Sequence, residues 1–69
     1  MQIKLIEARK LAGKTQREMA KIIGISTTSY TNKELGKQQF TITEMFDLAN
    51  YFNTTLDDLF VQRKTPKME

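Results

Sequence analysis

Small polar side chains crowd one short stretch of this sequence, and hydrogen bonding is the chemistry that they can perform. In GISTTSYTNKELGK, residues 24–37, six of the fourteen positions are Ser, Thr or Asn. Such side chains hydrogen-bond their own backbone and favour caps and turns, so they are poor or middling choices inside a helix. Because the stretch otherwise has helical spacing, these residues need a reason to be there other than helix stability.

The other reactive residue types argue against catalysis. The 69-residue chain has no Cys and no His, which removes thiol nucleophiles, disulfides, the usual zinc ligands and the commonest general base. The adjacent carboxylates Asp57 and Asp58 are explained as first-turn charges of a short helix. A domain of this size buries only about 60% of the surface that its unfolded chain exposes, which leaves little room for a deep active site. We therefore expect no enzyme activity, no metal and no cofactor.

Charge is unevenly distributed along the chain. Residues 1–37 carry eight basic and three acidic side chains, whereas residues 38–60 carry four acidic and no basic ones. This asymmetry indicates two surfaces with different partners; the alternative is that both are ordinary solvated helix faces. No apolar run approaches the roughly 20 residues of a membrane span. We expect a cytoplasmic protein of a bacterium or a phage-infected host, without a membrane partner.

Helical spacing predicts an all-α domain of five short helices. Capping boxes begin two of them, at Thr15 with Glu18 and at Thr41 with Glu44. The expected helices cover about residues 2–12, 16–23, 27–35, 42–52 and 56–60. The expected domain covers residues 1–61, and residues 62–69 are expected to form a flexible basic tail.

The apolar side chains predict most of the core. In the fourth helix we expect Ile42, Met45, Leu48, Ala49 and Phe52 to face inward, because they lie on one side of the helix. Further apolar residues are expected to be mostly core in so small a domain: Ile3, Ile6, Leu11, Phe40, Tyr51, Phe60 and Val61.

The second and third helices are joined only by residues 24–26, the short Gly-containing connection of a helix-turn-helix. Ala20 lies where these two helices would cross, so its small side chain permits a close approach. Gly24 can adopt a positive φ that strains other residues. Ile25 and Tyr30 are expected to be buried beneath the third helix, which leaves its other side free.

At these positions the sequence resembles the helix-turn-helix domain of lambda-type phage repressors and Cro proteins. The resemblance covers roughly residues 2–60 and is carried by TQREMAKIIGIS, by KELGK and by TTLDDLF. It implies a compact five-helix DNA-binding domain, like the lambda repressor's, whose third helix enters the major groove. An operator-binding transcriptional regulator of the repressor or Cro type is the function that it implies.

The resemblance also implies which residues contact bases. Carried over by position, they are Ser26, Thr27, Thr28, Thr31 and Asn32. The helical spacing agrees, because residues 27, 28, 31 and 32 share one face opposite Tyr30. The Asn32 amide can pair with adenine, and a Thr methyl can pack against the methyl group of thymine. The alternative is a merely solvated polar face.

Phosphate contacts are implied at further positions. In the family, Gln16 at the start of the second helix would bind a phosphate, supported by the positive end of that helix. The other phosphate candidates are Lys14, Arg17, Lys33, Lys37, Gln38 and Gln39. Lys33 is expected to lay its stem along the core and to hold its ammonium near a phosphate. Arg9 and Glu34 match positions that form a structural ion pair in several family members.

Several properties stay open at the level of sequence. We expect a homodimer at least on DNA, bound to a pseudo-palindromic operator, with residues 52–61 as the favoured interface. A competing hypothesis is an antitoxin-like protein-interaction module that uses the acidic residues 38–60 or apolar surface to bind a protein partner, with DNA binding secondary.

Overall fold

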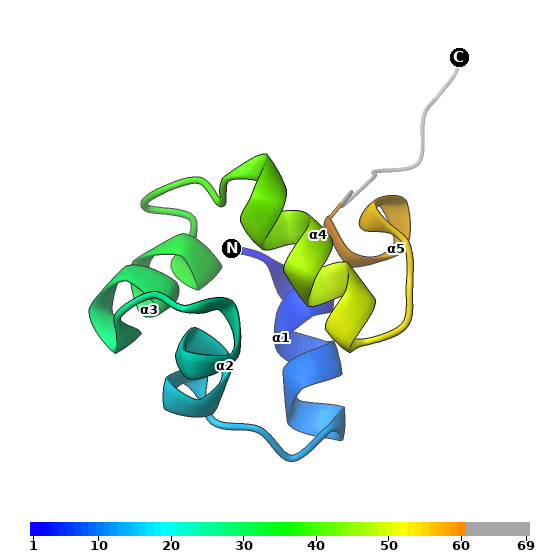
Figure 1. Cartoon of the computed structure of the whole chain (residues 1–69), viewed down its shortest axis with the longest axis horizontal. Helices are drawn as coiled ribbons and strands as arrows, with labels where there is room; N and C mark the ends of the chain where they lie inside the picture. The colour runs from blue at the N-terminus through cyan, green and yellow to red at the C-terminus, as the bar shows by residue number, and fades with distance from the viewer. Residues whose placement is uncertain (61–69) are drawn as a thin grey trace.

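The computed structural model describes residues 1–60, and the expected boundary and basic tail at residues 61–69 lie outside this range. Within it the fold is all-α and contains no strand (Figure 1). The helices are α1 (Ile3–Leu11), α2 (Gln16–Ile23), α3 (Thr27–Leu35), α4 (Ile42–Tyr51) and α5 (Leu56–Phe60). None of these helices is long and apolar enough to cross a membrane.

Side-chain caps determine where four of the helices begin. The hydroxyls of Thr15 and Thr41 each accept a hydrogen bond from the backbone amide three residues further on. The carboxylates of Glu18 and Glu44 accept in turn from the backbone amides of Thr15 and Thr41, so both predicted capping boxes are confirmed. The hydroxyl of Ser26 caps α3 by accepting from the amide of Ser29, and that of Thr55 caps α5 by accepting from the amide of Asp58, both at 3.1 Å. These caps satisfy amides that the first turn of a helix leaves without partners.

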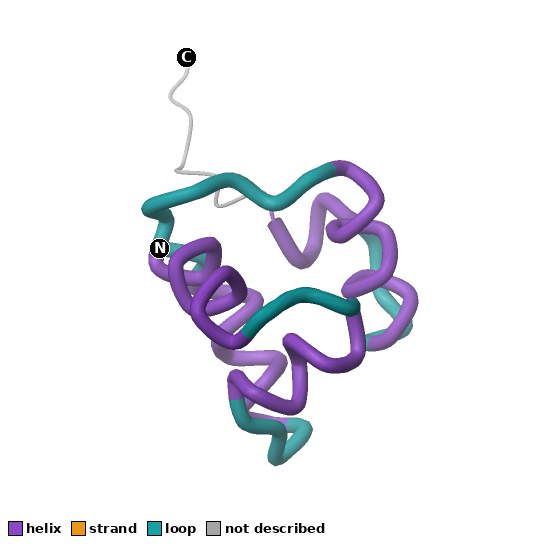
Figure 2. The backbone as a smooth tube through the Cα atoms, turned by 60° about the vertical axis from the view of Figure 1, so that its left-hand side comes forward, coloured by secondary structure: helices purple, strands orange, loops and turns teal. Residues whose placement is uncertain are grey.

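The core lies where the helices meet. In Figure 1, α1 is near the centre, with α2 and α3 towards one side and α4 and α5 towards the other, and Figure 2 shows that the helices are joined by loops. Contacts join α2 with α3, α1 with α5, and α4 with both α5 and α2. The buried apolar residues come from all five helices and one loop: Leu5, Met19, Ala20, Tyr30, Phe40, Leu48, Ala49 and Leu59.

Three aromatic rings connect distant parts of the chain. Phe40, in the loop after α3, packs edge-on against Tyr30 at 5.9 Å between ring centroids and against Phe60 at 5.6 Å. Such edge-to-face pairs contribute about 0.5–1.5 kcal/mol beyond the area that they bury. Phe40 therefore anchors the loop between α3 and α4 to the core, whereas residues 36–39 of the same loop are exposed.

Four apolar residues differ from the predicted core. Ile3 and Leu11, the first and last residues of α1, are 51% and 90% exposed, and Ile42 and Tyr51, the first and last residues of α4, are 60% and 40% exposed. All four lie at a helix terminus, where helical spacing still places a side chain on the apolar side but no neighbouring helix fully covers it. The prediction that they are core residues is wrong.

Candidate nucleic-acid interface

The connection between α2 and α3 has the geometry of a helix-turn-helix. Gly24 adopts φ 79° and ψ 31°, a left-handed conformation, and ends α2. The amide of Ile25 then donates to the carbonyl of Ala20 at 3.0 Å, which closes the turn, and the Ile25 side chain packs against the core. Ala20 is buried as expected for a small residue beneath a helix crossing.

Helix α3 has one buried and one exposed side. Tyr30 and Glu34, one turn apart, are both fully buried. Thr27 and Thr28 in the first turn are exposed, and Asn32 is half-buried. The helix is thus fixed to the domain by one side and presents short polar side chains on the other, as the spacing predicted.

The five predicted base-contact residues differ in what their polar groups do. The side chains of Thr27, Thr28 and Asn32 make no hydrogen bond within residues 1–60. Ser26, by contrast, uses its hydroxyl as the cap of α3, and the Thr31 hydroxyl donates to Oε1 of Gln16 at 3.3 Å. Three of the five are therefore free to bond to an external partner, whereas two already have an internal role.

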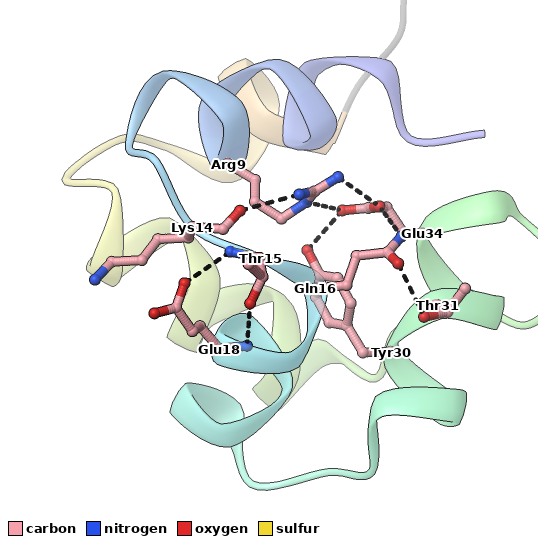
Figure 3. Close-up of polar contacts among 8 residues, drawn as sticks. All are labelled: Arg9, Lys14, Thr15, Gln16, Glu18, Tyr30, Thr31 and Glu34. Atoms are coloured by element: carbon pink, nitrogen blue, oxygen red, sulfur yellow. Dashed lines mark hydrogen bonds and ion pairs between the residues drawn. The ribbon is translucent and has the colours of Figure 1, made fainter.

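A buried carboxylate connects three helices at the base of this surface (Figure 3). Glu34 of α3 is 1% exposed and forms a salt bridge of 2.9 Å with Nε of Arg9 in α1. A second bond comes from Arg9 Nη2 at 3.3 Å, and the amide Nε2 of Gln16 donates to Oε1 at 2.8 Å. The Tyr30 hydroxyl donates to Oε2 at 2.8 Å. Each carboxylate oxygen thus accepts two hydrogen bonds, which offsets the desolvation of a buried charge.

The protonation state of Tyr30 suits its role in this cluster. Burial, followed by the hydrogen bond to Glu34 and the negative charge of that side chain, raises the pKa of the Tyr30 hydroxyl well above its usual value. The hydroxyl therefore remains a donor at any physiological pH. Arg9 has a further role, because its Nη1 donates to the carbonyl of Lys14 at 3.0 Å and so fixes the loop before α2.

Sequence reasoning paired Arg9 with Glu34 but missed the roles of Gln16 and Tyr30 in the same cluster. Tyr30 and Glu34 are four residues apart on one helix, a spacing that brings side chains together and could have indicated their contact. Gln16 and Glu34 are 18 residues apart. No spacing rule links residues on different helices, so that contact requires the three-dimensional structure.

The predicted phosphate-contact residues differ in their exposure. Arg17 at the start of α2 is exposed, as are Lys37, Gln38 and Gln39 in the loop after α3, while Lys14 is half-buried. The amides of Lys37 and Gln38 donate to the carbonyl of Asn32 at 2.8 and 3.4 Å, so this loop begins in contact with the last turns of α3. These exposed residues therefore follow directly after the C-terminal end of α3.

Lys33 differs from the other basic residues because it has an internal partner. Its ammonium donates to both oxygens of Glu44, at 2.7 and 2.9 Å, and both side chains are 13% exposed. Partial burial acts to raise the pKa of Glu44, but the hydrogen bonds from Lys33 and Thr41 prevail and hold it below the usual value. The pair connects α3 to the start of α4, and a phosphate contact by Lys33 stays a prediction.

Comparisons with known proteins agree with this geometry. A family model described as helix-turn-helix matches residues 5–59. An uncharacterised HTH-type transcriptional regulator of Archaeoglobus fulgidus is 31% identical over 61 residues, which cover 88% of this chain and 87% of that protein. No solved structure matches. The chain therefore belongs to the Cro/cI-type helix-turn-helix family of DNA-binding transcription regulators.

Proposed function

We propose that the protein reads a specific double-stranded DNA operator by inserting α3 into the major groove. One observation carries the proposal: the exposed side of α3 presents Thr27, Thr28 and Asn32, whose polar groups have no hydrogen-bond partner within residues 1–60. Short side chains let a helix approach base edges closely. The amide of Asn32 suits adenine, and the Thr methyl groups suit thymine.

Phosphate contacts on both sides of α3 would set its depth and angle in the groove. Gln16 lies in the first turn of α2, where backbone amides without intrahelical partners and the positive end of the helix favour an anion. Lys37 and Gln38 follow the C-terminal end of α3 and are exposed. Contacts of this kind position a protein on DNA, whereas base contacts supply the sequence preference.

In regulatory terms we propose a repressor or Cro protein of the phage type, which binds as a homodimer to a pseudo-palindromic operator. A two-fold dimer places its two recognition helices about one turn of DNA apart and so requires two symmetric half-sites. The region favoured for the interface begins at Phe52 and includes α5. This helix packs on α1 and α4, on the opposite side of the domain from α3 (Figure 1).

Selection of bound sites from a random DNA pool tests the proposal directly. The expected result is one sequence motif with two inverted half-sites whose centres lie about 10 base pairs apart. A motif without symmetry would refute the dimer while leaving specific binding intact. If no sequence is enriched over the starting pool, sequence-specific recognition by α3 is refuted, and the competing hypothesis of a protein-interaction module gains support.

A further inference from the structure

The buried carboxylate determines which way the Gln16 side-chain amide must point. Arg9 donates to both oxygens of Glu34, and the Tyr30 hydroxyl donates to one of them, so both oxygens are acceptors in this cluster. A carboxylate in this state can only accept. Gln16 must therefore present its NH₂ group to Glu34, at 2.8 Å, and its carbonyl oxygen to the opposite side.

The orientation of Gln16 in turn determines the role of Thr31. The carbonyl oxygen of Gln16 lies 3.3 Å from the Thr31 hydroxyl, a contact that is drawn as a dashed line in Figure 3. Because that oxygen can only accept, the single hydroxyl hydrogen of Thr31 must be the donor. Towards any external partner Thr31 then offers its methyl group and oxygen lone pairs, but no hydrogen.

We propose that Thr31 is a positioning residue, which acts on DNA through Gln16 and does not read a base with its hydroxyl. With its carbonyl bonded to Thr31 and one N–H bonded to Glu34, the Gln16 amide is fixed at both ends. Its second N–H has no acceptor within residues 1–60, so it is available to donate to a phosphate. Because the Ser26 hydroxyl caps α3, the side chains that read bases by hydrogen bonds are then Thr27, Thr28 and Asn32. This inference rests on the proposed function.

The two possible roles of Thr31 differ in what they do to sequence preference. A residue that positions a phosphate ligand changes the affinity for all sites by one factor, because phosphates carry no sequence information. A residue that bonds to a base changes the preference at one operator position. Binding of Thr31 variants to operators substituted at each position separates these outcomes.

Two substitutions isolate the hydroxyl. Thr31→Val keeps the shape of the side chain but removes the hydroxyl, whereas Thr31→Ser keeps the hydroxyl and removes the methyl group. We expect Thr31→Val to weaken binding about three- to tenfold, by the same factor at every operator position, because Gln16 loses its fixed orientation and with it one net hydrogen bond to a phosphate. Thr31→Ser should recover most of that loss. Thr43→Val is the matched control, since Thr43 is exposed on α4 and has no side-chain hydrogen bond in the described part of the chain.

A double-mutant cycle tests whether Thr31 acts through Gln16. In a Gln16→Ala background, Thr31→Val should weaken binding by less than twofold, because its partner has already been removed. NMR spectra of the free protein supply a readout without DNA: the side-chain NH₂ resonances of Gln16 should shift in Thr31→Val and stay unchanged in Thr43→Val.

The outcomes are distinguishable. A change in preference at a single base pair in Thr31→Val, or an undiminished effect of that substitution in the Gln16→Ala background, would overturn the inference while leaving the proposed function intact. Unchanged Gln16 resonances in Thr31→Val would overturn it as well. A wild-type protein that selects no DNA sequence would refute the proposed function, and with it the inference.

Discussion

The hydroxyl of Tyr30 donates a 2.8 Å hydrogen bond to the carboxylate of Glu34, one helical turn further along α3. Both side chains are fully buried, whereas Thr27 and Thr28 in the first turn of the same helix are exposed. The same helix therefore carries a polar cluster that binds it to the domain and a polar surface that faces solvent. The first prediction concerns the buried cluster.

Arg9→Met should destabilise the fold far more than Tyr30→Phe. The arginine supplies the positive charge opposite Glu34, and removal of one partner of a buried ion pair costs about 3 kcal/mol. Tyr30→Phe removes one hydrogen bond and keeps the packing, so a loss of about 1–2 kcal/mol is expected. Urea unfolding measures both free energies of unfolding. Equal losses would mean that the charge of Arg9 contributes no more than a single hydrogen bond.

The salt bridge between Lys33 and Glu44 should make stability depend on pH in acid. Because the folded state holds the pKa of Glu44 below its ordinary value of 4.5, this contribution is present above that pH and is lost as the pH falls further. In Glu44→Gln the dependence of the unfolding free energy on pH below about 4.5 should therefore flatten. Unfolding curves in urea between pH 7 and pH 3 provide the measurement. A slope identical to that of the wild type would contradict the prediction.

Base recognition is expected to depend on Asn32 and Thr28. Replacement of either by Ala should weaken binding to the selected operator by about 1–3 kcal/mol, the range for loss of a good base contact, and leave binding to random DNA unchanged. Fluorescence anisotropy with operator and random duplexes at one salt concentration gives both affinities. An equal loss on random DNA would argue against a base contact.

Lys37 is expected to contact a phosphate. Lys37→Ala should weaken binding to every sequence and reduce the slope of log affinity against log salt concentration by about 1. Lys4→Ala is a suitable control, because Lys4 lines a groove between α1 and α5. The prediction fails if Lys37→Ala leaves the salt slope unchanged or if Lys4→Ala reduces it equally.

The turn before α3 should tolerate Asn better than Ala. A Cβ atom at Gly24 would meet no atom within 4 Å, so only the left-handed backbone, φ +79°, opposes a side chain. Gly24→Ala should cost about 1 kcal/mol of unfolding free energy. Gly24→Asn should cost less, since Asn tolerates this conformation; Asn53 already adopts φ 56° in the same chain. Thermal unfolding compares the two, and equal losses would indicate a steric cause.

Much of the fold could be predicted from the sequence because its local signals are strong. The capping boxes at Thr15 and Thr41 and the glycine at position 24 predicted helix boundaries that the structure confirms. Each of these signals acts within a few residues of chain. In the apolar stripe of α4, the burial of Leu48 and Ala49 was also predicted correctly.

The errors and omissions arise where distant helices meet. Helical spacing gives the direction of a side chain around its own helix, but it does not say whether another helix covers that direction. Leu11 and Ile42 were predicted to be buried for this reason. The ammonium of Lys33 is bonded to Glu44 of α4, a contact that the spacing within α3 could not reveal. The specific base and phosphate contacts remain predictions.

The separation of the two sides of α3 has an evolutionary consequence. Thr27, Thr28 and Asn32 share no hydrogen bond with the cluster around Glu34, so substitutions at these three positions leave the folding of the domain largely untouched. If these side chains read the operator as proposed, single changes on one side of the helix can give descendants of this protein new target sequences without a compensating mutation elsewhere. Thr31 and Gln16 are the exception, because a change at either position disturbs the other.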